Sequence, residues 1–149
     1  MSSSTSVSTT EVYGFAIERT AKFIKRCFQQ VLKKTGEEIT VDQWVIMYEL
    51  YKCDGLSQFE IGERTYKQAP AITRILDFLS SRNLITREAV PDDRRKFQIH
   101  LTQQGKQKVE KLLPMALEFR RKGWEGLTDE DMHHLLRILN RIDQNFRKQ

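Results

Sequence analysis

The chain has 149 residues, of which 39% are hydrophobic and 30% are charged, with a net charge of +5. Its length suits one compact domain with additional helices, and its composition is typical of a soluble protein rich in exposed helix. No run of about 18 apolar residues is present, which excludes a membrane-spanning helix and predicts a cytoplasmic protein.

The first ten residues, MSSSTSVSTT, contain neither basic residues nor an apolar segment. This composition predicts a disordered tail over residues 1–10 and argues against a signal peptide. The chain has two cysteines, Cys27 and Cys53. Two cysteines form no disulfide framework, and their number fits a reducing compartment.

One long helix is expected from Glu11 to about Thr35, because apolar residues recur along a single stripe. Such a helix is roughly 37 Å long, which is more than a small core can cover. The surplus apolar surface therefore predicts a partner, most simply a second copy of the chain. The stripe comprises Phe15, Ala16, Phe23, Ile24, Cys27, Phe28, Val31 and Leu32.

A second helix is predicted after Gly36, where Thr40 and Gln43 form a capping box. Its apolar face is wide enough to pack beneath the elements that follow. That face contains Trp44, Val45, Met47, Tyr48 and Leu50.

Two short helices are predicted next. Ser57 and Glu60 form a capping box that opens the first, which ends near Arg64. The second has Pro70 in its first turn, where a missing N–H does no harm. Its apolar residues at helical spacing are Ile72, Ile75, Leu76 and Leu79. The remaining face carries Gln68, Thr73, Arg74 and Asp77, of which Asp77 is expected to orient a basic neighbour.

A β-hairpin with a basic tip is predicted after these helices. Apolar and polar residues alternate from Lys96 to Leu101, which is typical of a half-buried strand. Residues 85–90 supply the partner strand, and residues 91–93 make the turn. The alternation places Arg94, Lys96, Gln98 and His100 on the solvent face. Arg95 lies on the other face with Phe97, and it is expected to pair with Asp93 and brace the turn.

Basic residues are concentrated in this part of the chain. Between Arg64 and His100 there are eight basic and four acidic residues, which is more than an ordinary solvated surface predicts. A helix pair followed by a basic hairpin is typical of a winged helix-turn-helix, a unit that places one helix in the DNA major groove.

The C-terminal part is predicted to be two amphipathic helices. Thr102 caps the first, which runs to about Trp124 with a kink expected at Pro114. Thr128 and Asp131 cap the second. Its apolar residues recur at coiled-coil spacing and are Met132, Leu135, Leu139, Ile142 and Phe146.

The chain resembles the MarR family of bacterial transcription regulators. The family signature stands here as Asp93-Arg94-Arg95, then Leu101-Thr102 and Gly105. Residues 72–79 match the family's recognition helix, and residues 83–87 match the entry to its wing. A looser resemblance extends from about Tyr13 to Phe146.

The resemblance implies a mainly α fold with a small β-hairpin wing. Residues 40–102 would form the winged helix-turn-helix DNA-binding domain. In the resembled family the N- and C-terminal helices interlock as a helical dimerisation domain, which corresponds here to residues 11–35 and 103–149.

The function implied is that of a transcription regulator, more often a repressor, which binds double-stranded DNA as a homodimer. A small effector, often an aromatic or phenolic acid in relatives, would release a pseudo-palindromic operator. Candidate effector-pocket residues are Phe23, Trp44 and Tyr48, although an aromatic core is the simpler interpretation of all three. Candidate DNA contacts are Gln68, Ala69, Pro70, Thr73, Arg74, Arg94 and Lys96.

Two alternatives remain open: a winged-helix protein-interaction module, and a thiol-based redox regulator using Cys27 or Cys53. An interaction module would need neither a basic wing tip nor a polar recognition face. Relatives that sense organic peroxides carry a reactive cysteine near the start of the first helix, where alignment places Ala16. No enzyme activity, cofactor or metal is expected, because no phosphate loop, catalytic triad or metal-ligand spacing is present.

Overall fold

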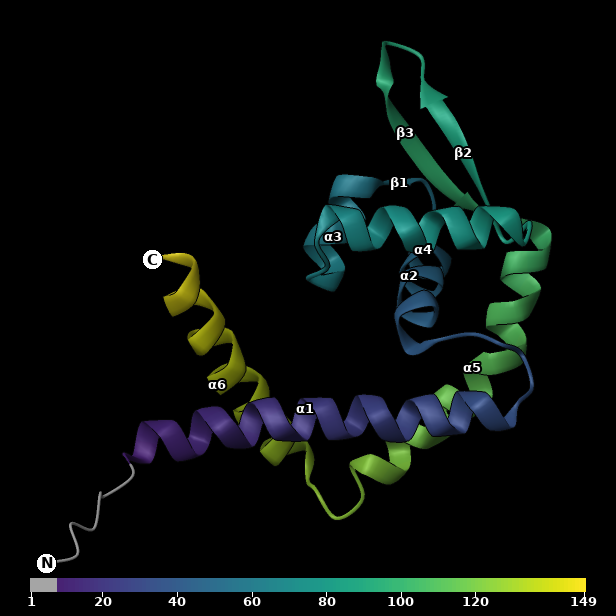
Figure 1. Cartoon of the computed structure of the whole chain (residues 1–149). Coiled ribbons are helices and arrows are strands. Elements are labelled where there is room, and N and C mark those ends of the chain that lie inside the picture. Colours follow the sequence, from purple (N-terminus) through teal and green to yellow (C-terminus); the bar gives the residue numbers. More distant parts are fainter. Residues whose placement is uncertain (1–7) are drawn as a thin grey trace, which may run out of the picture. The chain divides into compact units, whose positions relative to one another are not determined.

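The computed structural model describes residues 8–149, apart from the side chains of Thr9, Thr10 and Arg94. The chain divides into two compact units, the first ending at Leu113 and the second covering Pro114–Gln149. Figure 1 shows the elements of both units. They are α1 (Thr9–Lys34), α2 (Val41–Lys52), β1 (Leu56–Ser57), α3 (Gln58–Thr65), α4 (Ala69–Ser81), β2 (Ile85–Val90), β3 (Asp93–Leu101), α5 (Gln103–Gly123) and α6 (Asp129–Arg147).

Helix α1 begins earlier than predicted, at Thr9. Ser8 and Glu11 form a capping box, in which the Glu11 N–H donates to Ser8 Oγ over 3.3 Å and the Ser8 N–H donates to Glu11 Oε2 over 3.0 Å. The expectation of a disordered tail over residues 1–10 is therefore wrong from Ser8 onward, because a capping signal lies within the Ser/Thr-rich run. Residues 1–7 lie outside the described part of the chain.

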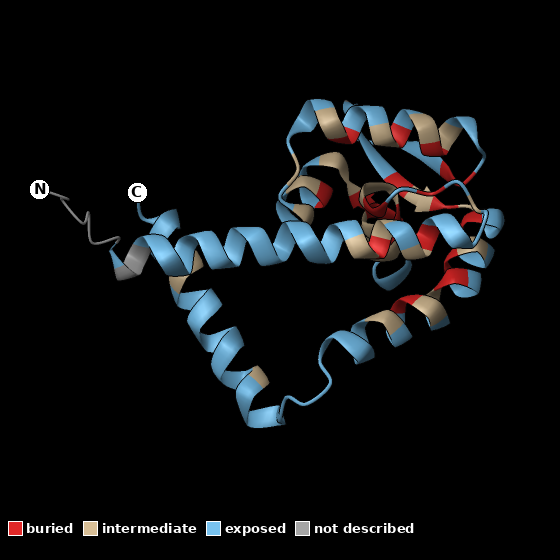
Figure 2. Ribbon diagram, turned by 60° about the horizontal axis from the view of Figure 1, so that its bottom comes forward, coloured by how far each residue is buried: buried red, intermediate tan, exposed pale blue. Residues whose placement is uncertain are grey.

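The core of the first unit lies where α2, α3 and α4 meet the base of the sheet (Figure 2). The capping boxes predicted to open α2 and α3 are both present. The side chains that these helices bury occur at helical spacing, as predicted. They include Trp44, Met47, Leu50, Ile61, Ile72, Leu76 and Leu79.

The predicted hairpin is present within a three-stranded antiparallel sheet of order β1-β3-β2. Strand β1, which was not predicted, pairs Leu56 with Ile99. A strand of two residues is too short to show an alternating pattern in the sequence. The hairpin itself is in register from Ile85 opposite Leu101 to Ala89 opposite Phe97.

A bulge interrupts the hairpin close to its tip. Ala89 pairs with Phe97, but Val90 pairs with Asp93, so residues 94–96 of β3 have no opposite residue on β2. The bulge breaks the strict alternation of faces that the sequence predicted over this segment. Phe97, the last residue of β3 in regular register before the bulge, is 45% exposed, whereas Ile99 and Leu101 nearer the core are buried.

Helix α5 begins in close contact with the start of the wing. Thr102 caps the helix as predicted: its hydroxyl oxygen accepts a hydrogen bond from the Gly105 N–H over 3.0 Å. The same hydroxyl donates its proton to Asn83 O over 2.6 Å. The Thr102 N–H donates to Leu84 O over 3.1 Å. A Cβ atom at position 105 would lie 2.1 Å from Leu84 O, so this contact requires glycine.

The terminal helices expose much of their apolar surface within the chain. Phe28 and Leu32 at the C-terminal end of α1 are buried, but Phe15 and Phe23 are 66% and 62% exposed. In the second unit, α6 begins at the predicted Thr128 capping box and buries none of its residues. Its exposed apolar side chains include Leu135, Leu136, Ile138, Leu139 and Phe146.

None of the helices in the described range has the length and apolar character needed to cross a membrane. Helix α5 is continuous through Pro114 and ends at Gly123, one residue before the predicted end.

Glu37, between α1 and α2, connects this loop to α5. Its carboxylate accepts a hydrogen bond from Lys108 Nζ over 2.7 Å and pairs with Lys111. The Glu37 side chain is only 14% exposed. Hydrogen bonds from Lys108 and then Lys111 hold the pKa of Glu37 below its ordinary value, against the effect of burial.

Replacing Gly105 with alanine should destabilise the protein. The new methyl group would meet a backbone oxygen that cannot rotate away, so α5 must shift from the wing, at a cost of about 3 kcal/mol in the free energy of unfolding. Urea unfolding followed by circular dichroism measures this loss. Gly123→Ala is the matched control, because a Cβ there has no atom within 4 Å. Equal stability of the two variants would contradict the close contact.

The substitution Glu37→Gln should cost about 1 kcal/mol at pH 7, because the two lysines lose a partly buried carboxylate. A lowered pKa means that this contribution is present above the unfolded-state pKa of glutamate and is lost as the pH falls through the folded-state value. The stability difference between parent and variant should therefore shrink below about pH 4.5. A difference that is constant from pH 7 to pH 3.5 in urea titrations would rule the ion pair out as its source.

Candidate nucleic-acid interface

The N-terminal half of α4 presents the predicted reading residues on one exposed surface. Gln68 is the N-cap of α4, yet its side chain makes no capping hydrogen bond. The opposite side of the helix is buried in the core through Ile72, Leu76 and Leu79. The structure therefore brings together five of the predicted contacts, all exposed: Gln68, Ala69, Pro70, Thr73 and Arg74.

Gln58, at the start of α3, contacts this surface and was not predicted from the sequence. Its Nε2 donates to Thr73 Oγ1 over 2.8 Å and approaches Ala69 O at 3.4 Å. A glutamine directly after a helix cap has no local signal that identifies this contact. The two helices of the pair are thus joined by side chains at the surface as well as by their shared core.

Asp77 joins α4 to the wing. Its Oδ1 lies 2.6 Å from Nη2 of Arg87 on β2. The expectation that Asp77 orients a basic neighbour is confirmed. This ion pair holds strand β2 of the wing next to α4, which carries the predicted DNA contacts.

The wing tip places Arg95 and Lys96 in exposed positions within the bulge. The side chain of Arg94, the principal predicted wing contact, lies outside the described residues. Asp93 Oδ1 accepts the backbone N–H of Arg95 over 3.0 Å. Asp93 therefore stabilises the turn, as expected. The hydrogen bond that the structure shows is with the backbone N–H of Arg95, however, and not with the guanidinium group that was expected from the sequence.

A groove of about 790 Å³ separates the start of α3 from the wing strand β3. The Arg95 and Lys96 side chains line it together with two phenyl rings, Phe59 and Phe97. Phe59 is 75% exposed. Apolar and cationic groups therefore lie side by side next to the wing tip.

The base of the wing is held by Asp54, in the loop between α2 and β1. The His100 Nδ1–H donates to Asp54 Oδ2 over 2.8 Å, and the Leu101 N–H donates to Asp54 Oδ1 over 3.0 Å. Burial by itself would raise the pKa of Asp54, but these hydrogen bonds, His100 first, bring it below the ordinary value. His100 thus faces the α2–β1 loop, whereas alternation placed it on the solvent face.

The basic residues of the winged unit fall into two groups. Five of them pair with acidic side chains: Lys52 and Arg64 with Glu49, Lys67 with Asp42, Arg82 with Glu38, and Arg87 with Asp77. Within the part of the chain that the structure describes, no ion pair involves Arg74, Arg95 or Lys96. Among the described residues of the winged unit, 40–102, the Lys and Arg side chains without an ion pair thus lie on α4 and at the wing tip.

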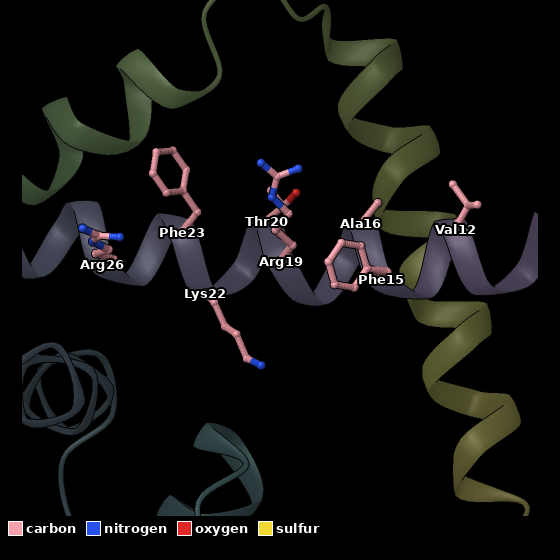
Figure 3. Close-up of a pocket in the computed structure, with 8 residues that line it drawn as sticks. All are labelled: Val12, Phe15, Ala16, Arg19, Thr20, Lys22, Phe23 and Arg26. Atoms are coloured by element: carbon pink, nitrogen blue, oxygen red, sulfur yellow. The ribbon is translucent and has the colours of Figure 1, made fainter. Parts of the chain in front are cut away.

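The three aromatic residues considered for an effector pocket do not line a common cavity in the described structure. Trp44 is 1% exposed, lies edge-on to Phe28 and stacks on Tyr48 with ring centroids 5.5 Å apart. The core interpretation is therefore confirmed for Trp44. Phe23 instead projects from α1 into a groove whose lining residues all belong to that helix (Figure 3).

The two cysteines are free and lie at separate places in the first unit. Cys27 is partly buried on α1, and Cys53 is exposed at the end of α2. Among the described residues, no group of three or more His, Cys, Asp or Glu side chains is arranged to hold a metal ion.

A family model described as the MarR family matches residues 39–97, which span α2 to the middle of β3. Those residues contain the helix pair and the wing described above. The winged part of the chain therefore matches the MarR family. The resemblance inferred from the signature residues is thereby confirmed, as is the mainly helical winged fold with a small antiparallel sheet.

Solved structures of MarR-type proteins share the fold over most of their length. AbsC of Streptomyces coelicolor, a MarR family transcriptional regulator, has a TM-score of 0.83 and 21% identity over 96% of this chain and 98% of AbsC. MepR of S. aureus, in a complex with DNA, has a TM-score of 0.79 and 24% identity over 89% of this chain and 97% of MepR.

A third structure concerns regulation of the DNA binding of Bordetella bronchiseptica BpsR by 6-hydroxynicotinic acid. BpsR has a TM-score of 0.78 and 22% identity over 89% of this chain and 99% of BpsR. At these identities the likeness concerns the fold.

Proposed function

We propose that this MarR-family protein is a sequence-specific DNA-binding transcription regulator that acts as a repressor on a pseudo-palindromic operator. The observation that carries the proposal is the division of charge in the winged unit. Five basic residues of the unit pair with acidic side chains, whereas Arg74, Arg95 and Lys96 are exposed without an ion pair in the described structure. Cations left available on a helix and an adjacent hairpin suit a phosphate-rich partner.

In this proposal α4 enters the major groove and the wing contacts the neighbouring groove or backbone. Gln68 and Arg74 can reach base edges or phosphates, and Ala69 and Pro70 allow close approach of the helix start. Arg94 and Lys96 act from the wing, where a narrow minor groove concentrates negative potential. MepR, which shares this fold, has been solved in a complex with DNA.

The regulator acts as a homodimer in this proposal. Apolar residues of α1, such as Phe15, and of α6, such as Phe146, are exposed within the single chain. Exposed apolar surface on two long helices is unfavourable in water, and a second copy of the chain would cover it. Two copies of α4 would then face two half-sites of one operator.

A small aromatic effector is proposed to control DNA binding, by analogy with the regulation of BpsR by 6-hydroxynicotinic acid. The candidate pocket residues differ in their accessibility to such an effector. Because Trp44 is packed in the core, its ring is accessible only if the core opens, whereas Phe23 is exposed on α1.

The substitution Arg94→Ala should weaken binding to every DNA sequence by a similar factor, because it removes a groove or phosphate contact rather than a base contact. The slope of log affinity against log salt should fall by about one. Fluorescence anisotropy on the selected operator and on mixed genomic DNA, each titrated with salt, measures both quantities. Lys34→Ala, which removes an exposed cation at the end of α1, is the control and should leave the slope unchanged. Parental affinity and slope for Arg94→Ala would remove the wing tip from the interface.

The operator should contain two half-sites whose centres lie about 10–10.5 bp apart, because both α4 helices must enter major grooves on one face of the duplex. Inserting about five base pairs between the half-sites turns one of them to the opposite face. Only one half-site can then be used, and affinity should fall by about 10²-fold or more. The same insertion placed outside the half-sites is the control. Tight binding to the interrupted operator would mean that the two winged units act independently.

A further inference from the structure

The hydroxyl group of Thr73 is held inside the helix pair by two hydrogen bonds. It donates to Ala69 O, one turn earlier in α4, over 3.0 Å. It accepts from Nε2 of Gln58 on α3 over 2.8 Å. A hydroxyl has one proton, so Thr73 has no donor left for a base edge.

The Gln58 amide is oriented by the same contacts. Ala69 O lies 3.4 Å from Gln58 Nε2, and a carbonyl oxygen can only accept. The NH₂ group of Gln58, rather than its Oε1, must therefore face Ala69 and Thr73. Both of its protons are then directed to these two oxygens, which leaves Thr73 to donate to Ala69. The three groups thus determine one another's orientation.

Thr73 nonetheless lies on the exposed surface of α4. Its side chain has two heavy atoms beyond Cβ, and Oγ1 is turned toward Ala69 and Gln58. The group left to face a bound duplex is the γ-methyl. A threonine with a free hydroxyl could hydrogen-bond to several base edges, whereas a methyl group selects an apolar partner.

We propose that Thr73 recognises the C5-methyl group of a thymine in each half-site, and that Gln58 is the positioning residue that holds Thr73 in the required rotamer. Thymine alone among the DNA bases presents a methyl group in the major groove. This inference rests on the proposed function, because it requires that α4 enters the major groove. Removing one buried methyl contact should change affinity by about fourfold.

The test begins with operators selected from randomised duplex DNA by the parent protein. Each thymine is then replaced singly by deoxyuridine, which lacks only the methyl group. At one position in each half-site, the parent should bind the uracil form about fourfold more weakly. Thr73→Ser keeps the hydroxyl and loses the methyl group, so it should bind the thymine and uracil forms of that position equally well.

The role of Gln58 is tested by the ratio of affinities for the two forms rather than by affinity itself. Gln58→Ala frees the Thr73 hydroxyl, and Gln58→Glu removes the NH₂ donor while keeping the shape. Both should lower the preference for thymine toward one, with unchanged circular dichroism. The ratio of affinities cancels any loss of binding that affects the thymine and uracil forms equally, such as the repulsion of phosphates by the added carboxylate of Gln58→Glu. Gln107→Ala, at an exposed glutamine of α5, is the control and should keep the parental preference.

The possible outcomes distinguish failure of the proposed function from failure of the Thr73 methyl contact. A parent that selects no operator from the random pool overturns the proposed function and, with it, this inference. Selection of an operator at which Thr73→Ser retains the full thymine preference overturns the methyl contact alone. If the methyl contact holds but both Gln58 variants keep the parental ratio, then Gln58 does not position Thr73.

Discussion

The geometry of the winged unit depends on the backbone around Leu84. The Leu84 N–H donates to Leu79 O at the end of α4, and the Leu84 carbonyl accepts the Thr102 N–H at the end of the wing. Gly105 places the first turn of α5 against the same carbonyl, at a separation that leaves no space for a Cβ. The reading helix, the wing and α5 thus share one rigid junction.

Charge is distributed in the same unit so that structure and binding use different residues. Arg87 pairs with Asp77 between the wing and α4, and Asp54 holds the base of β3. These pairs position the elements and contribute little net charge. Three cations of the unit have no ion pair among the described residues: Arg74 on the exposed side of α4, and Arg95 and Lys96 at the wing tip. The exposed cations are therefore carried by elements that other ion pairs already hold in place. Fewer residues would need to become ordered on binding, which lowers the entropic cost of binding.

Local signals in the sequence predicted most of the fold, whereas contacts between distant residues were not predictable. The Thr40, Ser57 and Thr128 capping boxes depend on residues three apart, and all three open helices as expected. The bulge at residues 94–96 depends on which cross-strand pairs form, so the regular alternation of the sequence did not predict it. The Gln58–Thr73 and Asp54–His100 contacts join residues 15 and 46 positions apart, with no periodic pattern to reveal them.

Internal hydrogen bonding also narrows what α4 can read. The Thr73 hydroxyl and the Asp77 carboxylate, both on its exposed surface, already have partners within the chain. Among the described side chains of that surface, Gln68 and Arg74 are the polar groups for which the structure shows no internal hydrogen bond or ion pair. Because each good bidentate contact discriminates by about 1–3 kcal/mol, two such readers per copy supply limited specificity. Two half-sites read by the proposed dimer would double that number, so the specificity of the proposed regulator would depend on the geometry of its dimer.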